Sequence, residues 1–158
     1  MKKLEKVIQI IINTCLVFSL IAILFCASGF IQLKALKRPY VDFFGYTFFS
    51  VATGSMRPTL EVQDIIIVKI TDDVKVGDVI TYQDNKDFVT HRVVSNNKDK
   101  FITKGDYNNT EDKPIESKQV VGKMVCKIPN LGVMGKILLT PKVFVSIVVT
   151  LFLFCISF

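Results

Sequence analysis

One serine and the only histidine of the chain have the side chains needed for nucleophilic catalysis. Ser55 lies in the stretch GSMRP, in which Gly54 permits unusual backbone dihedrals and Pro58 disfavours helix at the residue before it. An exposed serine on such an extended or turn segment can attack a carbonyl if a base takes its proton. His91, in VTHRVV, has the side-chain type that can do so near neutral pH without strong tuning. Taken singly, a Gly-Ser pair is more often a turn, and a lone histidine on a strand is more often a surface or hydrogen-bonded residue.

Two aspartates follow the histidine and could orient its imidazole ring. Asp106 and Asp112 lie in the polar stretch TKGDYNNTED. A serine, a histidine and an aspartate can form a catalytic triad whatever their order in the chain, because the roles depend on geometry. A polar loop built on Asx turns explains the composition of this stretch equally well. The residues themselves do not say which aspartate would contact the histidine.

The sequence has too few histidine and cysteine residues for a zinc site or for a disulfide within the domain. The single histidine and Cys126, the one cysteine outside the apolar runs, make neither a zinc set nor an internal disulfide. The oxygen-bearing residues of DYNNTED are spaced as in a calcium loop, but Glu111 stands where glycine is needed and Ser117 where glutamate is needed. We therefore expect no metal and no cofactor.

The charge of the chain is concentrated next to apolar segments. The formal net charge is +6 over 158 residues, yet residues 40–136 contain 13 Lys and Arg against 13 Asp and Glu. The excess comes from Lys2, Lys3, Lys6, Lys34, Lys37, Arg38 and Lys142, less Glu5. A nucleic-acid-binding protein needs its basic patch on a folded face, so nucleic acid is not expected as a partner. The headgroups of membrane lipid are the expected anionic partner.

Two uncharged runs are candidates for membrane-spanning helices. Residues 7–33, after the short basic tail 1–6, carry no charge over 27 positions. A helix of that length is about 40 Å long, enough to cross the hydrocarbon of a bilayer. The apolar part of a cleaved signal peptide is only about 7–15 residues long, which favours an uncleaved anchor. Residues 143–158 are also uncharged and, if residues 137–139 join them, residues 137–158 predict a second spanning helix.

The region between the two runs, residues 34–136, predicts a small, mostly β domain. Short β-branched or aromatic runs are separated by Gly, Asn, Asp and Lys, as in antiparallel strands joined by turns. The runs are residues 64–70, 78–83, 87–94, 100–105 and 119–128. A length of about 100 residues is ordinary for one domain. We expect an antiparallel sheet or barrel.

An aromatic segment, YVDFFGYTFF at residues 40–49, directly follows the basic flank of the first apolar run. Its rings could lie at the level of the lipid headgroups. Alternatively, the segment could be the first strand of the domain, with Phe43 and Phe49 packed inward. Both interpretations stay open, since one strand can bury one face and expose the other.

Five stretches, taken in order, resemble the sequence boxes of type I signal peptidases. They are TGSMRPTL, VGDVITY, THRVV, TKGDYNNTED and VVGKMVCKIPNLG, and together they extend from about residue 51 to 132. Within this family the chain is similar to the endoplasmic-reticulum-type branch, because His91 precedes Arg92 and Val93 where the common bacterial enzymes carry a lysine base. The resemblance implies a mostly-β domain that presents its site at the membrane surface.

The resemblance also implies roles for individual residues. Ser55 corresponds to the nucleophile and His91 to the general base. Asp112 matches the acidic member of the site in this branch and Asp106, of the Gly-Asp pair, a supporting acid, with the choice between the two still open. Thr53 stands where the family often has a serine whose hydroxyl helps to form the oxyanion hole. The Ser55 backbone N–H would be the second donor.

The function implied by the resemblance is that of a membrane-bound serine endopeptidase that removes signal peptides from exported precursor proteins, with any accessory subunits unknown. The cleaved peptide would end in small residues such as Ala-x-Ala, and an extended substrate could pair with the strand edge near residues 47–53. The chain would be integral to the cell membrane, with its domain on the extracytoplasmic face. The charges on the two sides of the first run balance, so this topology follows from the mechanism and not from charge.

Two other functions fit parts of the pattern. One is a catalytically inactive, membrane-anchored β-module that binds a partner, which the joint presence of a serine, a histidine and two acids disfavours. The other is a self-cleaving serine–lysine peptidase of the repressor type, which His91 and the apolar runs disfavour. A Ser55→Ala variant separates the enzyme from the binding module.

Overall fold

The computed structural model of the protein describes residues 2–97, 100–132, 146 and 150. The chain divides into two compact units, one formed by residues 1–41 together with 136–158 and the other by residues 42–135. The second predicted spanning segment, residues 137–158, falls outside the described residues except at positions 146 and 150.

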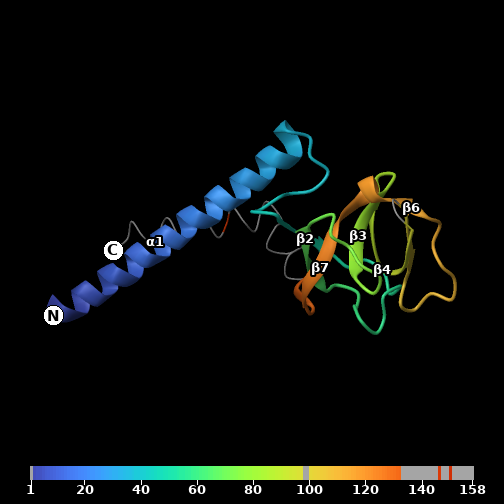
Figure 1. The fold of residues 1–158 in the computed structure, drawn as a ribbon. Coiled ribbons are helices and arrows are strands. Elements are labelled where there is room, and N and C mark those ends of the chain that lie inside the picture. The colour runs from blue at the N-terminus through green and yellow to red at the C-terminus, as the bar shows by residue number, and fades with distance from the viewer. Residues whose placement is uncertain (1, 98–99, 133–145, 147–149, 151–158) are drawn as a thin grey trace. The chain divides into compact units, whose positions relative to one another are not determined.

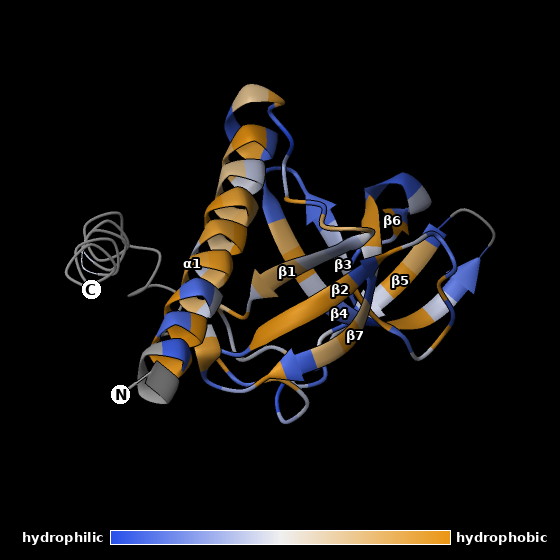
Figure 2. Cartoon of the chain, turned by 90° about the vertical axis from the view of Figure 1, so that its left-hand side faces the viewer, coloured by the Kyte–Doolittle hydropathy of each residue, from blue (hydrophilic) through white to orange (hydrophobic). Residues whose placement is uncertain are grey.

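A long apolar helix forms the described part of the first unit. Helix α1 runs from Lys2 to Phe30 and continues as a π-helical segment, η1, from Ile31 to Ala35. By length and composition, the segment Lys6–Ala35 can cross a membrane. Figure 2 shows apolar residues along most of α1. A helix with apolar residues on all sides suits lipid better than water.

A single antiparallel sheet of seven strands dominates the second unit (Figure 1). The strands are β1 (Tyr46–Ser50), β2 (Ile65–Ile70), β3 (Val79–Asp84), β4 (Asp87–Asn97), β5 (Lys100–Lys104), β6 (Ile115–Glu116) and β7 (Val120–Ile128), with a short 3-10 helix, η2 (Ser117–Gln119), before β7. Their order across the sheet is β1-β2-β7-β3-β4-β5-β6. The predicted mostly-β, antiparallel fold is confirmed, in the form of a sheet with β1 and β6 at its edges.

The five strands predicted from sequence are all present, with differences of one to three residues at their ends. Strand β6 was not predicted, because two residues are too few to show a periodicity. Strand β7 is the last of the described strands along the chain but lies within the sheet, where it pairs with both β2 and β3. No local pattern in the sequence indicates this placement.

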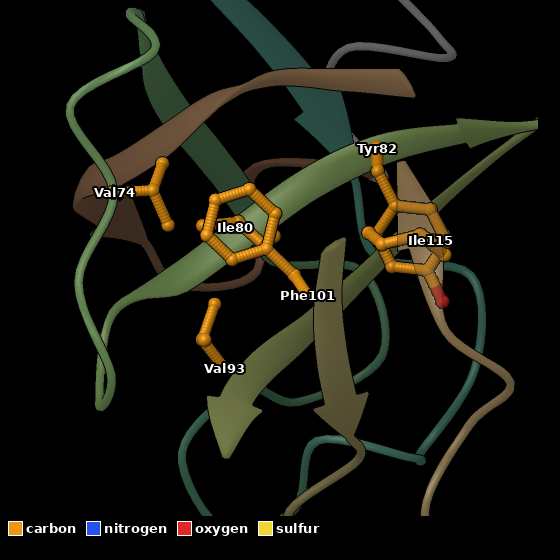
Figure 3. Close-up of a cluster of buried hydrophobic side chains, with 6 residues drawn as sticks. All are labelled: Val74, Ile80, Tyr82, Val93, Phe101 and Ile115. Carbon is orange, nitrogen blue, oxygen red and sulfur yellow. The ribbon is translucent and has the colours of Figure 1, made fainter. Parts of the chain in front are cut away.

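Two clusters of buried apolar side chains stabilise the domain. The first comprises Val74, Ile80, Tyr82, Val93, Phe101 and Ile115 (Figure 3). The second comprises Met56, Leu60, Ile66, Val68 and Val79. Alternation along the strands contributes to both clusters, as on β2, where Ile66 and Val68 are buried and their neighbours are not. Val74, Met56 and Leu60 come from loops. Burial of each such side chain contributes about 1.5–3 kcal/mol to folding.

The aromatic segment forms a strand only from Tyr46 onward. Thr47 is buried, and Phe49 packs against the cluster around Ile66, as the inward-facing alternative required. Phe43 lies before this strand and is half-buried, and its ring stacks on the exposed ring of Phe48 with centroids 6.2 Å apart. Strand β1 thus buries one face and exposes aromatic rings on the other.

Candidate active site

The loop between β1 and β2 carries Ser55 and is fastened at its base. The backbone N–H of Val51 donates to the carbonyl of Asp64 at 2.9 Å. The Asp64 side chain, in a residue only 2% exposed, accepts the backbone N–H groups of Glu61 at 2.9 Å and Asn130 at 3.2 Å. Hydrogen bonds to a carboxylate are strong, so these contacts fix the path of the loop.

The backbone of Ser55 is held against the loop that follows β5. The N–H of Tyr107 donates to the Ser55 carbonyl at 2.9 Å. Gly105 lies so close that a Cβ on it would come within 2.6 Å of the same carbonyl oxygen, so a side chain there would force the backbone apart. Met56, the next residue in the chain, is 2% exposed and packs into the second apolar cluster. These contacts determine where the Ser55 hydroxyl lies.

The imidazole of His91 lies between Ser55 and Asp112. His91 is a residue of β4, paired with Ile80 of β3, and is 7% exposed. Its Nε2 is 3.1 Å from Ser55 Oγ, and its Nδ1 is 2.6 Å from Asp112 Oδ2. Because a carboxylate only accepts hydrogen bonds, it favours the tautomer with the proton on Nδ1, which leaves Nε2 to accept the serine hydroxyl. A continuous chain of hydrogen bonds therefore runs from the alcohol to the carboxylate.

Asp112 belongs to a loop, but two contacts tie it to strand β5. The N–H of Asp112 donates to the Thr103 carbonyl at 2.8 Å. The hydroxyl of Thr103 donates to Asp112 Oδ2, also at 2.8 Å. Thr103 is completely buried, whereas the Asp112 side chain is 24% exposed. The strand therefore sets the position of the carboxylate.

Asp106 makes its hydrogen bonds to Arg92 and Thr59. Arg92 Nε donates to Asp106 Oδ1 at 2.9 Å and Arg92 Nη2 donates to Oδ2 at 2.7 Å, and the Thr59 hydroxyl also donates to this carboxylate. The Arg92 guanidinium lowers the pKa of Asp106 from its ordinary value, against the opposing effect of burial. Of the two aspartates that the sequence left open, Asp112 lies at the imidazole, and Asp106 joins β4 to the serine loop.

Asp106→Asn is expected to destabilise the domain in a pH-dependent way. Because the pKa of Asp106 is depressed in the fold, its ion pair stabilises the protein above the unfolded value of 3.8, and this contribution is lost as the pH falls through the folded value. We expect the free energy of unfolding to fall by about 1–3 kcal/mol at neutral pH, with a narrowing gap to wild type below about pH 4. Thermal unfolding of the full chain in detergent, monitored by circular dichroism across this pH range, measures the loss of stability at neutral pH and the narrowing gap at low pH. A gap that stays constant over the range would contradict the assigned cause.

A cavity of about 530 Å³ opens beside the serine hydroxyl. Residues 49–53 line it from the end of β1 and the start of the serine loop, and residues 88–91 line it from β4. The rings of Phe49 and Phe88 lie 4.9 Å apart in this lining. Most of the lining is apolar, and Ser55 and His91 are among its polar residues. A mostly apolar lining with a few polar groups is typical of a ligand-binding cavity.

The remaining predicted position, Thr53, lies close to the Ser55 hydroxyl. Its side chain is exposed, and its Oγ1 is 3.3 Å from Ser55 Oγ. Sequence reasoning missed the Thr103 hydroxyl and the tight fit of Gly105 against the serine carbonyl. Gly105 stands inside a quoted motif, but its closeness to Ser55 arises only when two distant loops meet. Thr103 has no local signal, because a threonine in a strand is ordinary.

Metal-ligand geometry is not found in the part of the chain that the structure describes. There, no three His, Cys, Asp or Glu side chains are grouped so that they could hold a metal ion. The two aspartates of the calcium-like spacing are engaged separately, Asp106 with Arg92 and Asp112 with His91.

Known proteins similar to the chain share one kind of activity. The family described as "Signal peptidase, peptidase S26" matches residues 7–123. Signal peptidase I W of Bacillus subtilis (strain 168) is 38% identical over 130 residues, covering 76% of this chain and 64% of that protein. Signal peptidase complex catalytic subunits of Lachancea thermotolerans and Metarhizium acridum are 34% and 30% identical, over 52% of this chain and 60% and 58% of theirs. The chain thus spans between 58% and 64% of the length of these curated relatives.

Proposed function

Because the chain belongs to the signal peptidase family, peptidase S26, we propose that it is a membrane-bound serine endopeptidase that removes signal peptides from exported precursor proteins. One observation carries this proposal: the hydrogen-bonded series of Ser55, His91 and Asp112 beside an open cavity. The relatives named above support the same activity. Family membership alone leaves the reacting groups open, and the site geometry is what favours a serine with a histidine base.

Ser55 is proposed as the nucleophile and His91 as the general base. Ser55 Oγ attacks the scissile carbonyl carbon while His91 Nε2 takes the hydroxyl proton, and the imidazolium then gives this proton to the leaving amine as the C–N bond breaks. Asp112 keeps the ring oriented and stabilises its positive charge. A water molecule that passes a proton to the same nitrogen hydrolyses the acyl-enzyme and restores Ser55. The 3.1 Å contact supports this role, because a general base must lie within hydrogen-bond reach of the proton it takes.

Thr53→Val and Thr53→Ser test the proposed oxyanion hole. We propose that the Thr53 hydroxyl, 3.3 Å from Ser55 Oγ, donates to the oxyanion together with the Ser55 N–H. Removal of one such donor costs about 10²–10³ in kcat. Valine keeps the shape of threonine without the hydroxyl and should show that loss with little change in KM, whereas serine should stay near wild type. Equal cleavage rates for the two variants would remove Thr53 from the site.

The residues that precede the cleaved bond are proposed to bind in the cavity beside Ser55. Strand β1 is at the edge of the sheet, and residues 51–53 continue from it along the cavity, so an extended peptide can add its backbone there. The contact between Phe49 and Phe88 narrows the apolar space available to side chains. Small residues such as alanine suit this space, and larger ones would displace the rings.

The apolar helix is proposed to hold the chain in the cell membrane as an integral protein, with the β domain on the extracytoplasmic face. The length and hydropathy of the segment Lys6–Ala35 support the anchor. The orientation is supported by the proposed reaction, because exported precursors present their cleavage sites on that face. An anchor also confines enzyme and precursor to one thin layer, which raises their effective concentration.

A protease added outside intact cells is expected to digest the β domain. In the proposed orientation the added protease can reach the domain, although it cannot enter the cytoplasm. Immunoblotting against an epitope tag placed at the surface turn Asn85–Lys86 reports it, with a cytoplasmic protein as the control for cell integrity. Full protection of the tag in intact cells, followed by digestion after lysis, would reverse the orientation.

Cleavage by the purified full chain, reconstituted in lipid vesicles, tests the proposed function. The substrate is a model precursor with an apolar signal segment and Ala-x-Ala before the mature sequence. We expect one cut directly after the second alanine, identified by mass spectrometry of both products. A precursor with phenylalanine in place of that alanine should resist cleavage. If the folded chain releases no product from the first precursor, it does not have this activity by itself.

A further inference from the structure

We propose that Thr103 is a positioning residue for the reaction, whose buried hydroxyl holds the Asp112 carboxylate in the orientation that His91 requires. This inference rests on the proposed function of the site, and it concerns a residue that does not touch the reacting atoms. Thr103 acts through Asp112, and Asp112 acts through the imidazole.

The contacts of Thr103 fix Asp112 at two points. The bond from the Asp112 N–H to the Thr103 carbonyl, at 2.8 Å, fixes the backbone of the aspartate. The bond from the Thr103 hydroxyl to Asp112 Oδ2, also at 2.8 Å, fixes the rotation of the carboxylate. The same oxygen accepts from His91 Nδ1 at 2.6 Å. An oxygen with two such partners cannot turn away from the imidazole without breaking a bond to a buried group.

Thr103 carries its hydroxyl at a buried position, where a polar group needs a hydrogen-bond partner. Thr103 is completely buried on the inward face of β5, the face that also carries Phe101. A valine would fill the same volume without a polar group, whereas a buried hydroxyl is unfavourable unless it is hydrogen-bonded. The bond to Asp112 satisfies this requirement, and it gives a physical reason for a threonine at a position that packing alone would give to valine.

A second buried hydroxyl lies beside the first. Tyr82 belongs to the first apolar cluster (Figure 3) and is 4% exposed, and its Oη is 3.4 Å from Thr103 Oγ1. Burial raises the pKa of Tyr82, with the negative charge of Asp112 acting in the same direction, so the phenol keeps its proton. The carboxylate therefore lies beside two buried residues whose hydroxyl groups are neutral.

The other charged groups around this arrangement are engaged elsewhere or lie further out. Asp106 is paired with Arg92. Asp84, at the end of β3, also raises the pKa of Tyr82, but by less than burial does. Replacement of the Thr103 hydroxyl therefore changes the donors to Asp112 without removing a charge from the site.

Thr103→Val and Thr103→Ser in the full chain test the inference by kinetics and by NMR. His91 is the only histidine, so a chain labelled with ¹⁵N-histidine gives the signals of one imidazole. In wild type we expect a far-downfield Nδ1 proton, typical of a short hydrogen bond to a carboxylate. Thr103→Val should weaken or abolish that signal and lower kcat about 10–100-fold with KM nearly unchanged. Thr103→Ser keeps the hydroxyl donor, so it should retain both the downfield signal and the wild-type kcat.

The outcomes separate this inference from the proposed function. The NMR signal is recorded without turnover, so an inactive wild-type chain would refute the function while the Thr103 contact is still tested. A valine variant with wild-type kcat and an unchanged signal would overturn the inference, and so would equal losses in the valine and serine variants. If Thr103→Val does not fold, Thr103→Cys takes its place, because a thiol is a weak donor of similar size.

Discussion

Ser55→Ala is expected to stop precursor cleavage and to leave the fold intact. The variant removes the only atom that can form the acyl-enzyme in the proposed mechanism, so kcat should fall by at least about 10⁴-fold. The backbone contacts of position 55 do not involve the hydroxyl. The Tyr107 N–H still donates to the carbonyl, and Met56 still packs in the second apolar cluster. Release of the mature product from vesicle-bound precursor measures the loss.

The matched control is Ser95→Ala, which removes a hydroxyl from β4, the strand that carries His91. Ser95 pairs with Ile102 of β5 and lies outside the cavity lining, so its variant should cleave at the wild-type rate. Wild-type cleavage by Ser55→Ala would refute the enzyme mechanism. The membrane-anchored binding module would then be the better interpretation of the chain.

Asp112→Asn is expected to lower kcat by about 10⁴-fold with a much smaller effect on KM. An asparagine in place of the carboxylate allows the imidazole to take the tautomer with its proton on Nε2. In that state Nε2 donates to the serine and cannot accept its proton. The positive charge that develops on the ring during the reaction also loses its counter-ion, which lies 2.6 Å from Nδ1. Initial rates over a range of precursor concentrations separate kcat from KM.

Asp106→Asn is the matched comparison for Asp112→Asn. Both variants remove one carboxylate from the segment between β5 and β6, and both keep the size of the side chain. Because Asp106 contacts Arg92 and Thr59, its loss should reduce stability and have a far smaller effect on kcat. If the effects on kcat came out in the reverse order, the acidic member of the triad would be Asp106.

The site combines a rigid strand with two loops that are tied to other parts of the domain. His91 is held by the β-ladder between β3 and β4 and by burial beside the apolar clusters. Ser55 and Asp112 have no such ladder, and each depends on one other loop or strand, through Tyr107 and Thr103 respectively. Substitutions at these supporting positions should therefore affect the reaction even though they lie outside the reacting groups.

The fold could be predicted well wherever the information is local. Short β-branched or aromatic runs separated by Gly, Asn, Asp and Lys located β2, β3, β4, β5 and β7 within a few residues, because strands favour the first kind of residue and turns the second. The same reasoning left Phe43 open, and the structure shows it before β1, stacked on Phe48. It also could not find β6, which is a strand only because β5 lies beside it.

By itself, the sequence determined that the chain carries a long apolar helix, a small β domain and one serine and one histidine suited to nucleophilic chemistry. These are properties of side-chain type and short-range periodicity. Only the tertiary structure decided which acid meets the imidazole, because Ser55 and Asp112 stand 36 and 21 positions from His91 and reach it through strand register and loop packing. The same holds for Thr103 and Gly105. Their neighbours are set by pairings between distant segments, and a distance between such segments has no local signature in the chain.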